Sequence, residues 1–173
     1  MAGKEPDIGP TAKAVADNVR KLREDWDMNY TETSERLLAA ANWSINAVGI
    51  RRIEAGERRV TPDDLVALAL AFGVSPATLL MPSIRTVTAT DYVQLTGKPN
   101  PVEAVRAWAW LTAQDPFERG SAEVLLSFIN RSWPQWERER ALSRYRAVTS
   151  QMREELYDQL WPDEGPVQTD GDD

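Results

Sequence analysis

The chain has 173 residues, 42% of them hydrophobic, which is enough for one good core or two small ones. It contains no cysteine and no histidine, which excludes disulfide frameworks, zinc fingers and Ser-His-Asp or Cys-His catalysis, so we predict no enzyme activity, no metal and no cofactor. A formal net charge of −7 argues against a general nucleic-acid coat, since non-specific affinity comes from neutralised phosphates, but it leaves specific DNA binding open.

Residues 1–13 contain two glycines and two prolines with few apolar side chains, a composition that predicts a disordered arm. The segment lacks the apolar centre of a signal peptide, and no run in the chain approaches the roughly 20 apolar residues that span a bilayer. We therefore expect a cytoplasmic protein without a membrane partner.

The first predicted helix begins at about Ala14, because apolar side chains then recur at helical spacing. These side chains are Val15, Val19, Leu22 and Trp26. A second helix is predicted from Thr31, which can serve as its N-cap, to about Ala41. The connection that follows, residues 42–46, is longer than a tight turn.

Residues 50–59, IRRIEAGERR, are the most informative stretch of the chain. Ile50 and Ile53 are three apart and share one face of a predicted third helix over residues 47–55, while Arg51 and Arg52 lie on the other side. Between residues 43 and 59 there are four arginines and two glutamates. This local excess of positive charge favours a helix that meets phosphates.

The ends of the third helix and the two helices after it have local signals. Asn46 is the predicted N-cap of the third helix, and Gly56 ends it in the left-handed conformation. Thr61 followed by proline predicts the start of a fourth helix that ends before Gly73, and Ser75 followed by proline predicts a short fifth helix ending near residue 81.

From Val15 to Met81 the chain resembles the Cro/Xre-type helix-turn-helix repressors, and GIRRIEAGERRVTPDDLVALALAFGVSPATLLMP resembles their actinobacterial branch. The resemblance implies a five-helix bundle whose third helix lies in the DNA major groove. It also implies that Asn46, Ala47, Val48, Arg51 and Arg52 form the surface that meets DNA.

The resemblance implies different roles for the individual side chains. Arginine can pair with guanine, and small apolar side chains can touch a thymine methyl group, so the resemblance implies base contacts for Ala47, Val48 and Arg52. Arg58 and Arg59 follow the third helix, where the resemblance implies phosphate contacts. The alternative is that the arginines only solvate the outer helix face and pair with the nearby glutamates.

Two further residues of this stretch receive structural interpretations. Glu54 is expected to hold the chain after the third helix through backbone or arginine contacts. Gly49 costs about 1 kcal/mol in a helix relative to alanine, which either close approach of a phosphate or close packing against the second helix would explain. Thr33 stands where the resembled family usually carries leucine, which suggests looser packing of the second helix.

Beyond residue 82 the sequence predicts a linker or short strand over residues 83–100 and a mainly helical region over 101–161. Its first helix would begin at Asn100 and Pro101 with Val102, Val105 and Ala109 inward, and further helices are expected over 121–130 and about 135–160. Residues 162–173 predict an acidic, disordered tail. The segment 92–117 resembles a tail that often follows such domains in actinobacterial proteins.

Apolar side chains recur along the last predicted helix mostly at spacings of three or four. They are Trp136, Leu142, Tyr145, Val148, Met152, Leu156 and Leu160. Such a stripe must be covered, either by the chain's own helices at 101–130 or by the same helix of a second copy, and the charged residues around a narrow seam favour a homodimer.

Four tryptophans of the C-terminal region, Trp108, Trp110, Trp133 and Trp136, could form a stacking platform for single-stranded nucleic acid. However, residues 83–173 hold ten basic and fifteen acidic side chains. This charge favours core or interface positions for the tryptophans.

The sequence therefore predicts an all-α protein with a five-helix, lambda-repressor-like helix-turn-helix domain over residues 14–82, which we expect to fold alone. The predicted function is sequence-specific transcriptional regulation, most simply repression, with double-stranded DNA as the partner. The alternative is an antitoxin or other protein-interaction module that uses the same fold to mask a protein partner.

Overall fold

A computed structural model describes residues 8–118 and 120–160. The predicted acidic tail and residues 1–7 of the predicted arm lie outside the described residues. The chain forms two compact units that divide at Leu125.

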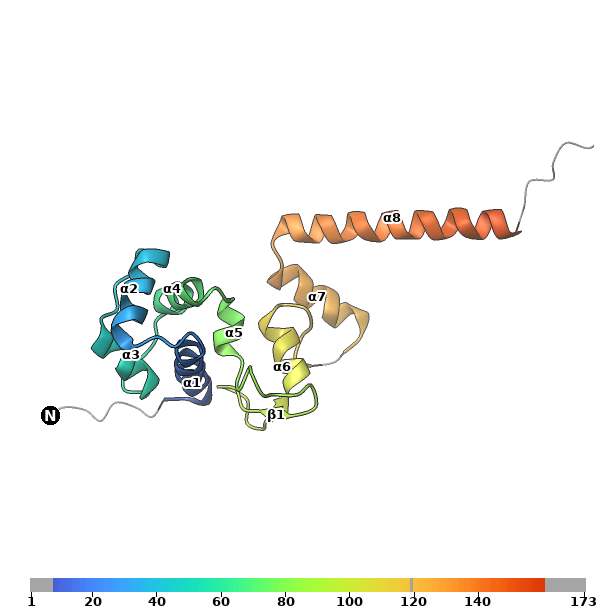
Figure 1. The fold of residues 1–173 in the computed structure, drawn as a ribbon. Coiled ribbons are helices and arrows are strands. Elements are labelled where there is room, and N and C mark those ends of the chain that lie inside the picture. Colours follow the sequence, from blue (N-terminus) through green and yellow to red (C-terminus); the bar gives the residue numbers. More distant parts are fainter. Residues whose placement is uncertain (1–7, 119, 161–173) are drawn as a thin grey trace, which may run out of the picture. The chain divides into compact units, whose positions relative to one another are not determined.

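The first unit begins with a bundle of five helices (Figure 1): α1 (Pro10–Asp25), α2 (Tyr30–Ala41), α3 (Ala47–Glu54), α4 (Pro62–Phe72) and α5 (Pro76–Leu80). Their inward faces share one core, whose largest fully buried members are Phe72, Leu37, Ile50, Ile53, Leu68, Leu79 and Val19. The predicted five-helix arrangement is confirmed, as are the caps of its last three helices. Gly73 ends α4 at φ +64°, in the left-handed region that glycine adopts without steric cost.

The start of α2 differs from the prediction. Asn29, and not Thr31, is the N-cap: its side chain accepts hydrogen bonds from the backbone of Thr31 and Glu32, and the Glu32 side chain accepts one from the backbone of Asn29. This reciprocal capping box needs a residue such as glutamate three positions after the cap, and Glu32 stands at that position after Asn29. Thr33, where looser packing was expected, is buried, and its hydroxyl donates to the Asn29 carbonyl at 2.8 Å.

The start of α1 also differs, because the helix begins at Pro10, within the segment predicted as a disordered arm over residues 1–13. Proline suits the first helical position, where its missing N–H would have no partner. Gly9, the N-cap residue, has no side chain to cap with, and a distant residue takes that role: Thr96 Oγ1 accepts from the backbone N–H of Thr11 at 3.3 Å, and Thr11 Oγ1 accepts from that of Thr96 at 3.0 Å.

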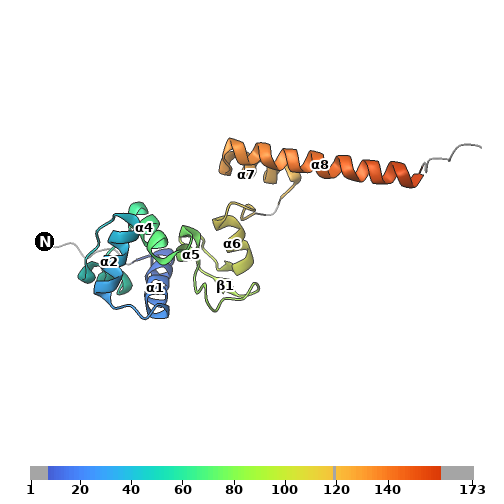
Figure 2. The ribbon, with the colours of Figure 1, turned by 45° about the horizontal axis from the view of Figure 1, so that its top comes forward.

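A second, smaller core follows α5 in the same unit. β1 (Tyr92–Val93) pairs antiparallel with β2 (Val102–Glu103), and α6 (Ala104–Leu111) comes directly after β2. The cluster contains Met81, Val93, Leu95, Ala104 and Ala107, with Trp108 packed against it. It adjoins α5, which packs against both α1 and α6 (Figure 2).

The prediction for α6 is therefore wrong in its start and its inward face. Val102 pairs in a strand and not in a helix, Ala104 and Ala107 are buried, and Val105, expected inward, is exposed. Strand pairing shifts the start of the helix to Ala104, so a different set of side chains faces the core.

Two helices complete the described chain, α7 (Ala122–Ser132) and α8 (Gln135–Leu160). α8 matches its predicted range. Three of the seven apolar side chains of its stripe, Trp136, Leu142 and Met152, are 63%, 56% and 56% exposed. Among the described residues, no helix combines the length and apolar character that a membrane span requires.

A fragment of residues 14–82 is expected to unfold cooperatively, because the larger core lies entirely between Val15 and Leu80. It should nevertheless melt about 10 °C below a fragment of residues 8–118, since it lacks the first turn of α1 and the Thr96 cap, together worth about 2 kcal/mol. Circular dichroism of both fragments during heating measures the difference. If the 14–82 fragment shows no cooperative transition, folding of the larger core requires residues outside this range.

Candidate nucleic-acid interface

The connection between α2 and α3 fixes where the outer face of α3 lies. Asn42 takes the left-handed conformation, at φ 49°, and ends α2. Ile45 is buried, and its carbonyl accepts a hydrogen bond from Ser34 Oγ at 2.7 Å. Asn46 then caps α3 by accepting from the backbone N–H of Gly49 at 2.8 Å. Its side-chain NH₂ has no hydrogen-bond partner among the described residues and is available to a ligand.

α3 has two faces of opposite character. Ile50, Ile53 and Glu54 are buried, whereas Val48 is 57% exposed and Arg51 and Arg52 are exposed beside it. Arg52 makes only a loose, solvent-exposed ion pair with Glu57, at 3.9 Å; pairs of this kind contribute little. The outward face therefore offers one apolar side chain and two arginines to a partner.

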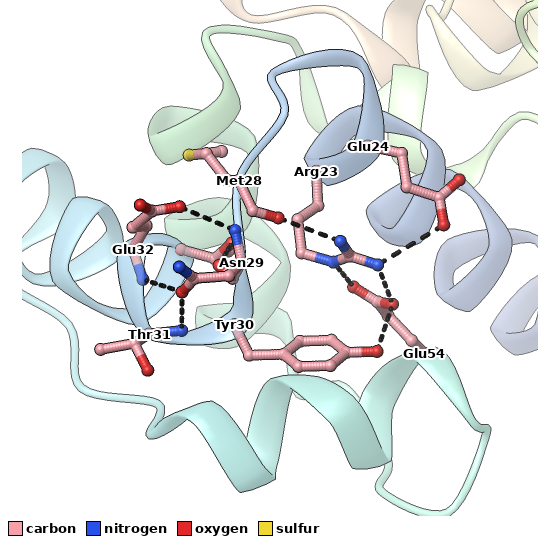
Figure 3. Close-up of polar contacts among 9 residues, drawn as sticks. Arg23, Glu24, Met28, Asn29, Tyr30, Thr31, Glu32 and Glu54 are labelled. Atoms are coloured by element: carbon pink, nitrogen blue, oxygen red, sulfur yellow. Dashed lines mark hydrogen bonds and ion pairs between the residues drawn. The ribbon is translucent and has the colours of Figure 1, made fainter.

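Glu54 anchors the C-terminal end of α3 to α1 (Figure 3). Arg23 Nε donates to Glu54 Oε1 at 2.7 Å and Arg23 Nη2 donates to Oε2 at 3.0 Å, a bidentate pair, while the Tyr30 hydroxyl reaches Oε2 at 3.4 Å. The Glu54 and Arg23 side chains are 3% and 13% exposed. The bond to Glu54 outweighs partial burial and raises the pKa of Arg23. Glu54 thus makes the arginine contact that was predicted, but the contact holds the end of α3 itself to α1 and not the chain after α3.

Each nitrogen of the Arg23 guanidinium has a partner in this cluster. Nη1 donates to the Met28 carbonyl at 3.0 Å, and the planar group lies over the Tyr30 ring, 4.6 Å from its centroid. Arg23 thus joins α1, the α1–α2 connection and α3 (Figure 3). Because guanidinium geometry is planar and fixed, the orientation of α3 on the bundle is fixed with it.

Two glycines of this region are explained by close packing. A Cβ at Gly49 would lie 2.8 Å from Ile45 Cγ2 and 3.3 Å from Asn46 Oδ1, so the close neighbour is the connection before α3, not α2. Gly56 has φ +70°, as predicted, and a Cβ there would also meet Ile8 Cδ1 at 2.5 Å. Both positions need the absence of a side chain.

Arg58 is placed differently from the expectation that it faces phosphate. Its Nη2 donates to both carboxylate oxygens of Asp64, at 3.3 and 3.2 Å, and its Nη1 is buried without a hydrogen-bond partner in the described part of the chain. Asp64 Oδ1 also accepts from Trp43 Nε1 at 2.9 Å. Asp64 therefore holds to α4 both the loop after α3, through Arg58, and the connection before α3, through Trp43.

Asp64, at the centre of this network, is buried. Burial alone would raise the pKa of its carboxyl group, but hydrogen bonds from Trp43 and Thr61 and the charge of Arg58 outweigh it and hold the pKa below its ordinary value. From the sequence, no role was predicted for Asp64. Its contacts with Trp43 and Arg58 have no local sequence signal.

Arg59, next in the loop, is exposed and has no ion-pair partner among residues 8–118 and 120–160. The predicted site residues thus divide into two groups. The first group lies on the cap and outer face of α3 or on the loop after it: Asn46, Ala47, Val48, Arg51, Arg52 and Arg59. The second is Arg58, which turns inward.

The described residues include no group of three or more acidic side chains that could hold a metal ion.

Comparison with protein families finds one match, in which residues 19–79 correspond to the helix-turn-helix family. The matched segment extends from α1 to α5 and contains the capped α3 with its exposed arginines. Searches of curated proteins and of solved structures returned no match to the chain.

Proposed function

We propose, with the helix-turn-helix match over residues 19–79 as the premise, that this chain is a sequence-specific DNA-binding regulator of transcription, most simply a repressor. The observation that carries the proposal is the two-sided α3, which is anchored by Glu54 and presents Val48, Arg51 and Arg52 to the outside. A short rigid helix of this form fits the major groove of DNA, whose width is about 12 Å. Sequencing the DNA fragments that the purified protein retains tests the proposal.

The exposed side chains suit different parts of DNA. Arg52 can donate two hydrogen bonds to guanine, and Ala47 and Val48 can contact thymine methyl groups. Arg59, on the loop, is suited to a phosphate oxygen. For Arg58 we propose no direct contact, because its guanidinium would have to leave Asp64.

We further propose that the protein acts as a homodimer formed through α8. The exposed Trp136, Leu142 and Met152 leave part of an apolar stripe without cover in a single chain, and pairing with the same helix of a second copy would cover it. A two-fold dimer places two recognition helices about 34 Å apart, on successive turns of one DNA face.

A protein-interaction module remains the second candidate, and one observation favours it. Trp43, Val66 and Leu70 line a hollow of about 230 Å³ between α2 and α4, and all three side chains are exposed. Clustered exposed apolar side chains are typical of protein contact sites. Under this alternative, Val66→Arg together with Leu70→Arg would abolish the function in cells while leaving DNA retention unchanged.

Arg52→Ala is expected to weaken binding to the retained sequence by about 1 to 3 kcal/mol and to relax base preference at one position, because a base contact carries sequence information. Competition binding against a set of single-base variants measures both effects. An equal loss of affinity for specific and random DNA would show that Arg52 does not read a base.

Arg59→Ala is expected to weaken binding to all sequences alike and to lower the slope of log affinity against log salt by about one, as for one lost phosphate contact. Binding measured at several salt concentrations gives the slope. Glu57→Ala, which removes an exposed charge from the same loop and no phosphate ligand, serves as the control, and its slope should not fall. A change confined to one DNA sequence would contradict the phosphate role.

A further inference from the structure

A cavity of about 460 Å³ lies beside the loop that follows α3, wholly within the first unit. We call it the loop cavity. It is bounded by the start of α1, the loop at residues 59–61, the start of α4, the end of α5 and Thr96. Its volume falls in the range of roughly 300 to 1,000 Å³ that is typical of small-molecule sites. Nothing in the proposed DNA contact requires such a space.

Most of the cavity wall is aliphatic, formed by Ile8, Val15, Val60, Leu65 and Leu80. It contains no aromatic side chain among the described residues that line it. An aliphatic wall of this kind can accommodate an alkyl chain, because contact between them removes apolar surface of both from water.

The polar side chains of the wall, one arginine and three threonines, can all donate a hydrogen bond. Arg59 supplies the single charge and has no ion-pair partner in the described part of the chain. Thr11, Thr61 and Thr96 line the same space, and each uses its hydroxyl oxygen to accept from a backbone N–H. Their hydroxyl protons are left to donate, so one cation and three O–H groups surround a space without a carboxylate.

We propose that the loop cavity binds a small amphipathic organic anion, such as a medium-chain carboxylate. The alkyl chain would lie against the aliphatic wall, and the carboxylate would accept hydrogen bonds from Arg59 and a neighbouring threonine. Hydrogen bonds from a guanidinium to a carboxylate are among the stronger ones in proteins, which makes Arg59 the residue that selects an anion over a neutral analogue.

The ligand would also regulate DNA binding, a consequence that rests on the proposed function. A bound carboxylate would neutralise the charge of Arg59, so the occupied cavity removes one phosphate contact. At about 0.15 M salt this loss weakens binding by about fivefold, the contribution of one neutralised phosphate. The small molecule would therefore act as an inducer that lowers affinity for all sequences alike.

Calorimetric titration of the full chain with octanoate, in the absence of DNA, tests the site directly. We expect saturable binding of one octanoate per chain and at least about tenfold weaker binding of octanol, which has the same chain length without the charge. Arg59→Gln should remove this preference for the anion. Arg52→Gln, an exposed arginine outside the cavity, should retain it.

Two further variants test the location of the site. Ala12 lines the cavity and is exposed, so Ala12→Trp should fill the space and abolish octanoate binding, while Lys13→Trp, one residue further along α1 and outside the lining, should not. Leu65→Trp provides a second filling variant should Ala12→Trp lower the melting temperature. Equal binding of octanol and octanoate, or binding that both filling variants leave intact, would overturn the proposal.

The proposed function and the cavity proposal can fail separately. Octanoate binding that obeys these variants, in a protein that retains no specific DNA, would leave the site established and the proposed function wrong. Specific DNA binding with no saturable binding of octanoate would support the proposed function and refute the ligand site.

Discussion

Replacing Glu54 with glutamine is expected to lower the free energy of unfolding by about 3 kcal/mol, because it leaves the charge of Arg23 partly buried without its carboxylate. The Met28 carbonyl, the Tyr30 ring and the more distant Glu24, at 3.5 Å, are contacts of the guanidinium that would remain. Urea unfolding followed by circular dichroism measures the loss.

Glu57→Gln is the matched control for this prediction. Glu57 lies three residues further along, is exposed, and makes only the loose pair with Arg52, so its replacement should change stability by less than about 0.5 kcal/mol. In a double-mutant cycle, Arg23→Met should cost far less in the Glu54→Leu background than alone. Equal effects of the two glutamine substitutions would show that Glu54 does not anchor α3.

Removing residues 133–173 is expected to give a folded monomer that binds the retained DNA at least about 100-fold more weakly, because two linked half-sites raise affinity through effective concentration. Sedimentation at tens of micromolar gives the oligomeric state, and titration of labelled DNA gives the affinity. Removal of residues 161–173 alone should leave both unchanged.

Point variants in the full chain test whether α8 pairs with a second copy without shortening the protein. Leu142→Glu and Met152→Glu place a charge in the predicted seam and should produce monomers, while Ala147→Glu, five residues from each and so on the other side of the helix from both, should not. A monomeric intact protein, or a truncated protein that is still dimeric, would show that α8 is not the dimer interface.

The parts of the fold that sequence analysis predicted correctly depend on local signals. The N-caps of α3, α4 and α5 and the glycine ends of α3 and α4 involve residues three or four positions apart, and the spacing of Ile50 and Ile53 sets the inward face of α3. Hydrogen bonds over such short separations follow from residue type alone. For the same reason the exposed position of Arg51 and Arg52 could be predicted.

The parts that sequence analysis missed depend on contacts between distant residues. The start of α1 is capped by Thr96, 85 residues away, and the guanidinium of Arg58 turns to Asp64 because Trp43 and the capping box of α4 hold that carboxylate in place. α6 starts late because Val102 pairs with Val93. None of these partners can be chosen from the spacing of residues along the chain.

Under the proposed function, the close approach of Gly49 to Ile45 limits how a DNA preference of this protein could be redesigned. Any side chain at Gly49 would push the buried Ile45 methyl group, at 2.8 Å, and the cap of α3 with it. A library for altered specificity should therefore vary residues 47, 48, 51 and 52 and keep position 49 fixed. If α3 reads DNA as proposed, natural divergence of binding preference would meet the same restriction at position 49.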